Sequence, residues 1–408
     1  MKGAAAARFT ESGNERDRIL TVFRMFPVTT LVISPYLILI LAQALMNSNP
    51  DTNFILGTMA LATGGSFLME VLLSIGHRTQ AHNGPADADR DQGHRQLFFL
   101  AKLALTVAAV AALVGVFSGS RTIFSQVSGS GNSSGGSLSS IFDHWQYAGI
   151  GLMIASYLKS QCPRGSLIRW TIFTVFVSGV AAAVTAIMEP LISLVIFVVI
   201  VFIYFEIIRL RHALGIGLIL LLVWPAAYSW RNDIRADGGI MVSQSVDAND
   251  RLRFDTQITR AAGFTVPNYL GQPGPTDILR YGVLPRVLDP DRPEISTGKI
   301  INVFLGGSAR SSYTFLPVAT LYFLEGPFIV CLVYAGWAVA MHLLMRSRVD
   351  VGPIRIMVFC LLVSGPLHWF ATFPDSTIGF VQSLVSILPL ALAMGLTSRV
   401  RAESNSGK

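Results

Sequence analysis

Charged residues are scarce in this chain. Only 13% of its 408 residues are Asp, Glu, Lys or Arg, against the roughly 25% of soluble domains. Apolar residues make up 52%, and several of their runs reach the roughly 20 residues with which a helix spans a bilayer. These runs lack the alternation of a membrane β-barrel. The composition therefore excludes a large soluble protein and predicts an all-α polytopic membrane protein.

Cysteine, metal-ligand clusters and internal repeats are also lacking. Cys162, Cys331 and Cys360 are too few and too scattered for a disulfide framework or a metal site, and the last two sit in apolar runs as packing residues. No His/Asp grouping has ligand spacing, so we expect neither metal nor cofactor. The first apolar run is too long and starts too late for a signal peptide. The missing repeats count against an inverted-repeat transporter.

The net charge of +7 comes from Lys and Arg residues spread between the apolar runs, a pattern of membrane orientation and not of nucleic-acid binding. Basic residues gather in every second segment, beginning with the N-terminal tail. The short loops on the other side carry only Arg121. The positive-inside rule then places both termini in the cytoplasm, and we expect a multi-pass protein of a bacterial plasma (inner) membrane.

We expect ten spans, at about 26–46, 54–75, 97–117, 141–157, 167–188, 191–208, 214–230, 315–345, 354–373 and 378–397. The organisation that follows is a cytoplasmic tail (1–25), seven transmembrane helices (26–230), a large external loop (231–312), three transmembrane helices (313–397) and a cytoplasmic tail (398–408). Glu189-Pro190 should turn a tight hairpin. A break should fall at Glu325-Gly326-Pro327.

The large external loop is the polar exception in an apolar chain. It has ten basic residues, nine of them arginine, together with nine acids. The planar guanidinium suits phosphate, so such a loop at the outer face fits an anionic lipid-linked substrate. A solvated loop with scattered ion pairs is the alternative. Residues 249–264 have near-helical apolar spacing, which predicts an amphipathic helix with Arg253 and Arg260 on one face, either a lid over a cavity or a helix packed on the loop.

A proline-rich unit follows, with three prolines in the nine residues from Pro285 to Pro293. Proline fixes φ and excludes regular helix, so this unit predicts a rigid turn that would hold Arg286, Asp289 and Asp291 in place. A plain turn without a functional role is the alternative.

The order of residues across 281–326 resembles a known signature. It comprises Pro285-Arg286, Asp289-Pro290-Asp291-Arg292-Pro293-Glu294, Ser296-Thr297-Gly298, Ser311-Ser312, Pro317, Leu321-Tyr322 and Gly326. This resembles the Wzy-type O-antigen and exopolysaccharide repeat-unit polymerases, in which a Pro-Arg, an aspartate and a "KPE"-like turn precede a Glu-Leu-Tyr-x-Asn-Phe-Gly element. The late external loop is also similar. Thr320 stands where the family has glutamate, Arg292 where lysine is common, and Glu325 where phenylalanine precedes the glycine.

The resemblance implies a GT-C-like architecture and an integral-membrane glycosyltransferase that polymerises polyprenyl-diphosphate-linked oligosaccharide repeat units into a cell-surface polysaccharide. The leaving group is a lipid diphosphate, so positive charge is needed where negative charge develops. The residues expected to bind the diphosphate are Arg253, Arg260, Arg280, Arg286 and Arg310. The residues expected at the reacting centre are Arg286, Asp289, Asp291, Glu294 and Glu325, with the Asp143/His144 pair as a further candidate base.

The expected partners are the lipid-linked oligosaccharide, membrane lipid, and chain-length regulator and flippase proteins, with no nucleic acid. An O-antigen ligase or another lipid-linked glycosyltransferase shares this plan. A polysaccharide flippase or transporter would need charged residues in the middle of the membrane and repeat symmetry. The sequence has few such charged residues and no evident repeat. Glu70 is an ionisable residue inside a predicted span and is therefore a candidate functional residue. Glu206 favours an ion pair with nearby arginines, and His368 with Trp369 favours an interface belt over a cavity lining.

Overall fold

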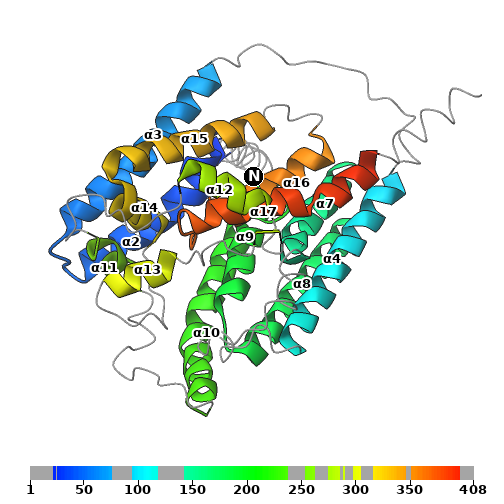
Figure 1. The fold of residues 1–408 in the computed structure, drawn as a ribbon, viewed down its shortest axis with the longest axis horizontal. Helices are drawn as coiled ribbons and strands as arrows, with labels where there is room; N and C mark the ends of the chain where they lie inside the picture. Colours follow the sequence, from blue (N-terminus) through cyan, green and yellow to red (C-terminus); the bar gives the residue numbers. More distant parts are fainter. Residues whose placement is uncertain are drawn as a thin grey trace, which may run out of the picture.

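The computed structural model describes residues 22–23, 25–75, 94–117, 142–237, 253–261, 274–284, 288–289, 297–304, 316–345 and 351–395. Within these ranges every regular element is a helix (Figure 1). Seven of the described helices are long and apolar enough to cross a membrane, and Glu189–Tyr204 and Pro353–Ser364 are shorter apolar helices. The chain is therefore a multi-pass helical membrane protein, as its composition predicts. The number of ten spans and a GT-C-like architecture stay predictions.

The elements in chain order are η1 (a π-helix, Val28–Ile33), α2 (Ser34–Met46), α3 (Thr52–Ile75), α4 (His94–Phe117), α7 (Trp145–Leu158), α8 (Arg164–Thr185), α9 (Glu189–Tyr204), α10 (Leu210–Asp237), α11 (Phe254–Thr259), α12 (Pro275–Val283), α13 (Thr297–Phe304), α14 (Pro317–Glu325), α15 (Pro327–Met345), α16 (Pro353–Ser364) and α17 (Asp375–Ser386). α10 runs seven residues past the predicted span, so the start of the predicted loop is helical.

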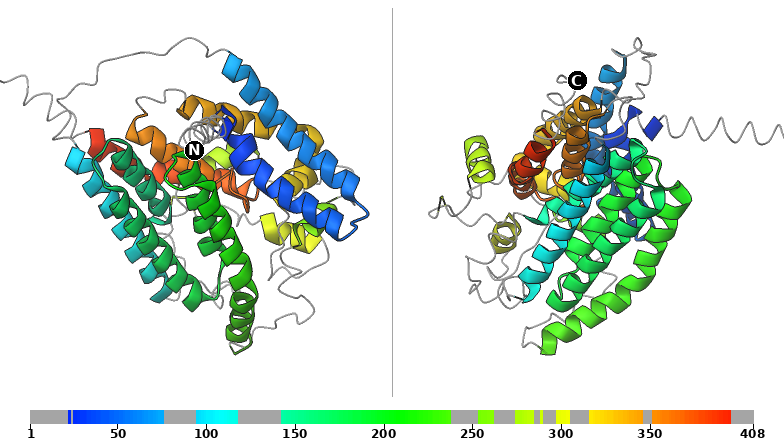
Figure 2. Two further views of the ribbon diagram at one scale, coloured as in Figure 1. Left: turned by 180° about the vertical axis from the view of Figure 1, so that it is seen from behind. Right: turned by 90° about the vertical axis from the view of Figure 1, so that its right-hand side faces the viewer.

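The long helices form two groups, which Figures 1 and 2 show side by side. In one group α3 packs along α15, together with η1, α2 and α14. In the other, α4 packs on α7 and α8, and α9 packs on α8. α16 joins the groups because it contacts α7 and α9 on one side and α15 on the other.

Small residues allow the closest helix contacts. A Cβ atom added at Gly65 on α3 would overlap the backbone carbonyl oxygen of Cys331 on α15. A Cβ atom at Gly151 on α7 would lie 3.1 Å from the Cys360 sulfur on α16. Glycine lets the two backbones approach in each case, as is common between membrane helices. Cys331 and Cys360 are packing residues, which confirms the sequence-based interpretation.

Two predicted interruptions are confirmed. α8 ends at Thr185 and α9 begins at Glu189, with Pro190 in its first turn. α14 ends at Glu325 and α15 begins at Pro327, because Gly326 between them has φ 81°, a left-handed conformation that favours glycine. The prediction of one span over 354–373 is wrong in its second half. α16 ends at Ser364, since Gly365 and Pro366 stop the helix, and a non-helical connection follows to Pro374.

Glu70 has a structural role at the start of the first span. Its side chain is 2% exposed, and its carboxylate accepts hydrogen bonds from the backbone N–H groups of Val28 at 2.7 Å and Thr29 at 3.3 Å. These N–H groups open the helix η1–α2, where backbone donors lack helical partners and the dipole favours negative charge. Glu206 lies outside the helices, exposed in the turn after α9 with φ 59°.

Candidate functional site

The described helices of the large loop dock on the helix bundle. α11 packs against α2, α3 and α14, and α12 packs along α17. α13 begins against the first residue of α17. In Figure 1 α11 and α13 lie beside α2 and α14, whereas α12 lies over α17. The α2–α3 turn contacts α11 through Asn49, and the α16–α17 connection contacts it through Phe370. We call this region, formed by α11–α13, the α2–α3 turn and the α16–α17 connection, the loop end.

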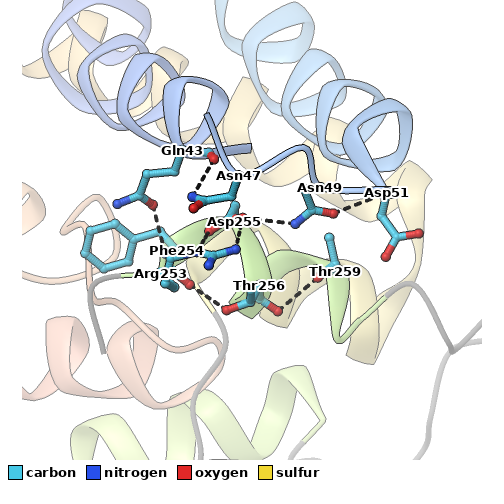
Figure 3. A network of polar contacts seen from close by, with 9 residues as sticks. All are labelled: Gln43, Asn47, Asn49, Asp51, Arg253, Phe254, Asp255, Thr256 and Thr259. Atoms are coloured by element: carbon cyan, nitrogen blue, oxygen red, sulfur yellow. Dashed lines mark hydrogen bonds and ion pairs between the residues drawn. The ribbon is translucent and has the colours of Figure 1, made fainter. Parts of the chain in front are cut away.

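α11 is held on the α2–α3 turn by polar contacts, which Figure 3 shows. The backbone N–H of Phe254 donates to Gln43 Oε1 at 3.0 Å, and Asn49 Nδ2 donates to Asp255 Oδ2 at 3.0 Å. The Asp255 side chain is fully buried. A buried carboxylate is costly unless it is paired, so the partners of Asp255 decide whether this docking is stable.

Arg253 supplies that pairing. Its Nε and Nη2 atoms each lie 2.8 Å from a different oxygen of Asp255, a bidentate arrangement. Burial raises the pKa of Asp255, but hydrogen bonds from Arg253 and Asn49 and the charge of Arg253 outweigh it, so the pKa is lowered overall. The guanidinium of Arg253 thus stabilises the docking of α11. The sequence did not predict this structural role.

The predicted amphipathic helix is shorter in the structure. α11 begins at Phe254 and ends at Thr259, with Arg253 and Arg260 flanking its two ends. Its buried side is formed by Asp255, Ile258 and the adjoining Ala261. The two arginines therefore cap a short docked helix and do not line one face of a long one.

α12 brings together two of the predicted site residues. Arg280 Nη2 lies 2.6 Å from Asp289 Oδ1, and the bond and the charge of Asp289 raise the pKa of Arg280. The Arg280 side chain is 51% exposed, whereas that of Asp289 is 8% exposed. Asp289 Oδ2 is buried and has no hydrogen-bond partner among the described residues. About half of the Arg280 side-chain surface is thus exposed beside a buried carboxylate.

α12 and α13 are both anchored to α17. Gln382 Nε2 donates to the Tyr281 carbonyl oxygen at 3.0 Å, and a Cβ atom at Gly282 would lie 2.5 Å from Val381. The Asp375 carboxylate accepts from the backbone N–H of Thr297 at 3.0 Å and from its hydroxyl at 2.5 Å. Asp375 therefore caps α13 from another part of the chain. Sequence reasoning missed it because its partner lies 78 residues away.

In the α16–α17 connection the side chain of His368 is buried and only 4% exposed. The backbone N–H of Phe370 donates to His368 Nδ1 at 3.1 Å, so the proton is on Nε2, which donates to the Ser193 carbonyl oxygen at 3.0 Å. The prediction that His368 belongs to an interface belt is wrong, because the ring is buried and ties the connection to Ser193, near the start of α9.

The same connection also reaches α2 and α11. The Trp369 and Tyr36 ring centroids are 6.2 Å apart, and those of Phe370 and Phe254 are 6.3 Å apart. Beyond these rings an open crevice lies between α14, α15 and the connection. Its walls are Pro317, Leu321, Val333, Tyr334, Trp337, Pro366, Ala371, Phe373, Ser376 and Thr377.

The remaining predicted residues are distributed as follows. Glu325 lies half-buried at the last position of α14 and makes no ion pair within the described ranges. Thr320, which stands where the resembling family has glutamate, is fully buried in the same helix. Arg286, Asp291, Glu294 and Arg310 lie outside the described residues. His144 directly precedes α7, next to Asp143.

The part of the chain that the structure describes has no group of three His, Cys, Asp or Glu side chains that could hold a metal ion. These features define a multi-pass helical membrane protein whose large polar loop contains short helices that dock on the helix bundle. Comparison of the chain with protein-family models, curated proteins and solved structures finds no match.

Proposed function

We propose that the protein is an integral-membrane glycosyltransferase that joins polyprenyl-diphosphate-linked oligosaccharide repeat units into a polysaccharide at the outer face of a bacterial plasma membrane. The observation that carries this proposal is the docking of α11, α12 and α13 on the apolar bundle. This docking supports the proposal because it holds Arg260 and Arg280 against apolar helices, and a lipid-linked anion has its headgroup at the membrane boundary. The order of residues across 281–326 supplies the choice of reaction.

The reaction requires of the protein mainly positive charge and the correct positioning of two lipid-linked units. A sugar hydroxyl of one lipid-linked unit attacks the anomeric carbon of another. The bond from that carbon to the diphosphate oxygen breaks, and the lipid diphosphate leaves with the electron pair. Cationic groups stabilise the leaving diphosphate. In this proposal Arg280 and Arg286 contact it, with Arg310, while Arg260 stands at the end of α11.

The hydroxyl proton needs an acceptor. Asp289 fits because its Oδ1 is occupied by Arg280 while its Oδ2 has no partner among the described residues. Glu325 is the second candidate, with Asp291 and Glu294 in the same stretch of sequence. A carboxylate within reach of the hydroxyl contributes as a general base, although a diphosphate leaves readily without strong assistance.

Arginine variants test the diphosphate role. Arg280→Ala and Arg286→Ala should each abolish polymer in a complemented deletion strain and leave single repeat units on the lipid carrier. Arg355→Ala is a matched control, because Arg355 is exposed in the first turn of α16, at the helix end away from the α16–α17 connection. Normal polymer length with both loop variants would contradict the proposal.

A ligase that transfers finished polymer shares the same leaving group, so the loop alone does not separate it from a polymerase. The two differ in what accumulates on the carrier when the protein is missing. A chain-length regulator and a flippase are the proposed protein partners, since repeat units must reach the outer face and polymer length must be set.

A further inference from the structure

The outer face of α12 is apolar. Leu279 and Val283 are four residues apart and share this face, and Leu284 adjoins them. These three side chains are between 39% and 60% exposed. On the opposite face Tyr281 and Gly282 are buried against α17. α12 is therefore apolar on both sides, which is unusual for a short helix of a polar loop and indicates that something apolar covers its outer face.

α12 packs along a part of α17 that lies inside a candidate membrane span, Asp375–Gly395. Gln382 of this span donates to the Tyr281 carbonyl oxygen in the middle of α12. At a rise of 1.5 Å per residue, Gln382 lies about 10 Å along the helix from Asp375. A span of this length matches the roughly 30 Å of hydrocarbon in a bilayer. The middle of α12 therefore lies level with the apolar layer and not above it.

Several polar groups of α12 have partners within the loop. In the first turn the backbone N–H of Gly274 donates to Asp277 Oδ2 at 3.2 Å, and at the other end the N–H of Leu284 donates to the Arg280 carbonyl oxygen at 2.9 Å. The Arg280 guanidinium is bonded to Asp289 at 2.6 Å, so it does not meet its surroundings as a lone charge. Such pairing suits a helix in contact with lipid, where an unpaired polar group is expensive.

We propose that α12 is embedded in the membrane, with Leu279, Val283 and Leu284 in contact with the acyl chains of bilayer lipid. Lipid is the occupant because α12 docks on a candidate span at the depth of the hydrocarbon, where acyl chains surround any side chain that faces away from the protein. The inference goes beyond the proposed function and holds whichever reaction the loop serves. It makes α12 a membrane-embedded part of a loop whose sequence predicts an external segment.

Cysteine accessibility in nanodiscs tests this inference. Leu279→Cys and Val283→Cys variants of the purified full-length protein, one molecule per phosphatidylcholine nanodisc, are treated with a membrane-impermeant maleimide. Both introduced thiols should react at least about tenfold more slowly than that of Asp51→Cys in the α2–α3 turn, because hydrocarbon disfavours the reactive thiolate. Asp51 is exposed, and Leu392, which is 65% exposed on the candidate span of α17, supplies the lipid-facing control. The unaltered protein gives the background from its three cysteines.

Brominated acyl chains distinguish lipid from protein as the cover of this face. Leu279→Trp should add fluorescence that dibrominated phosphatidylcholine quenches, as it should for Leu392→Trp, whereas the fluorescence added by Asp51→Trp should persist. Because Leu279 is exposed, its substitution leaves the packing of the fold intact.

Two results would overturn the inference. Reaction of either α12 thiol at the rate of Asp51→Cys would place the outer face of α12 in water. Slow reaction without quenching of the Leu279→Trp fluorescence would identify protein, and not lipid, as the cover. Neither measurement depends on catalysis, so either result would leave the proposed glycosyltransferase standing.

Discussion

Replacing Asp255 by asparagine should release α11 from the α2–α3 turn. The carboxylate is fully buried and accepts two hydrogen bonds from Arg253 and one from Asn49. Asparagine keeps the shape but loses the charge, and its amide nitrogen faces one of these donors. A hydrogen bond to a charged group contributes about 1.5–3 kcal/mol. Arg253 is 32% exposed, so water recovers part of the loss, and we expect about 2 kcal/mol.

Hydrogen–deuterium exchange of the nanodisc-bound protein measures this loss locally. A loss of about 2 kcal/mol corresponds to roughly 30-fold faster exchange. The amides to follow are those of Phe254, Arg260 and Ala261, which donate to Gln43, Thr256 and Ile258 respectively. Amides of α3 and α15 should exchange as in wild type, because the docking is local.

Asp51→Asn is the control for this experiment. Asp51 lies in the same α2–α3 turn and carries the same charge, but its side chain is exposed. Its variant should leave exchange in α11 unchanged. Equal exchange in the Asp255 and Asp51 variants would show that the ion pair does not hold α11, and the docking account of the loop would have to be abandoned.

Three further predictions concern pH, packing and the first span. The pKa of Asp255 is lowered in the fold, so the contribution of its carboxylate to stability is complete above the unfolded pKa of about 3.9 and is lost as pH falls through the lower folded pKa. Exchange protection of α11 should therefore stay constant from about pH 8 to 5. A loss of protection already near pH 6 would contradict the pairing of Asp255 with Arg253. Gly65→Ala should destabilise the α3–α15 contact by about 1–3 kcal/mol in thermal unfolding, whereas Gly64→Ala, with open space around its Cβ, should be neutral or stabilising; equal midpoints would refute the close approach. Glu70→Ala should cost about 1–3 kcal/mol by the same assay because two buried N–H groups lose their acceptor, and Glu70→Gln, which can keep the 2.7 Å bond from Val28, should cost less; an alanine variant as stable as wild type would show that the N–H groups do not depend on Glu70.

The helices were predictable because their cause is local. An apolar run of bilayer length is visible in the sequence, as are Gly326 and Pro327 at the α14–α15 break and Pro190 at the α8–α9 hairpin. The end of α16 at Ser364 was not predicted. Gly365-Pro366 is a helix-breaking dipeptide, but the apolar run continues through it.

The contacts of the loop end could not be predicted in the same way. Asn49 and Asp255 are 206 residues apart, and Thr297 and Asp375 are 78 apart. A carboxylate in a polar loop has the same sequence signal whether it is solvated or buried. Only the packing of α11 and α13 decides that Asp255 and Asp375 anchor the loop, while Arg280 beside Asp289 keeps half of its side chain exposed.

Lipid-linked intermediates in a strain that lacks this gene test the central claim most directly. Extraction of the polyprenyl-diphosphate pool, followed by mass spectrometry of the attached sugars, separates the candidate functions. The account predicts single repeat units on the carrier at the outer face. Long polymer accumulating on the carrier would identify a ligase, intermediates confined to the cytoplasmic face would identify a flippase, and either result would contradict a polymerase.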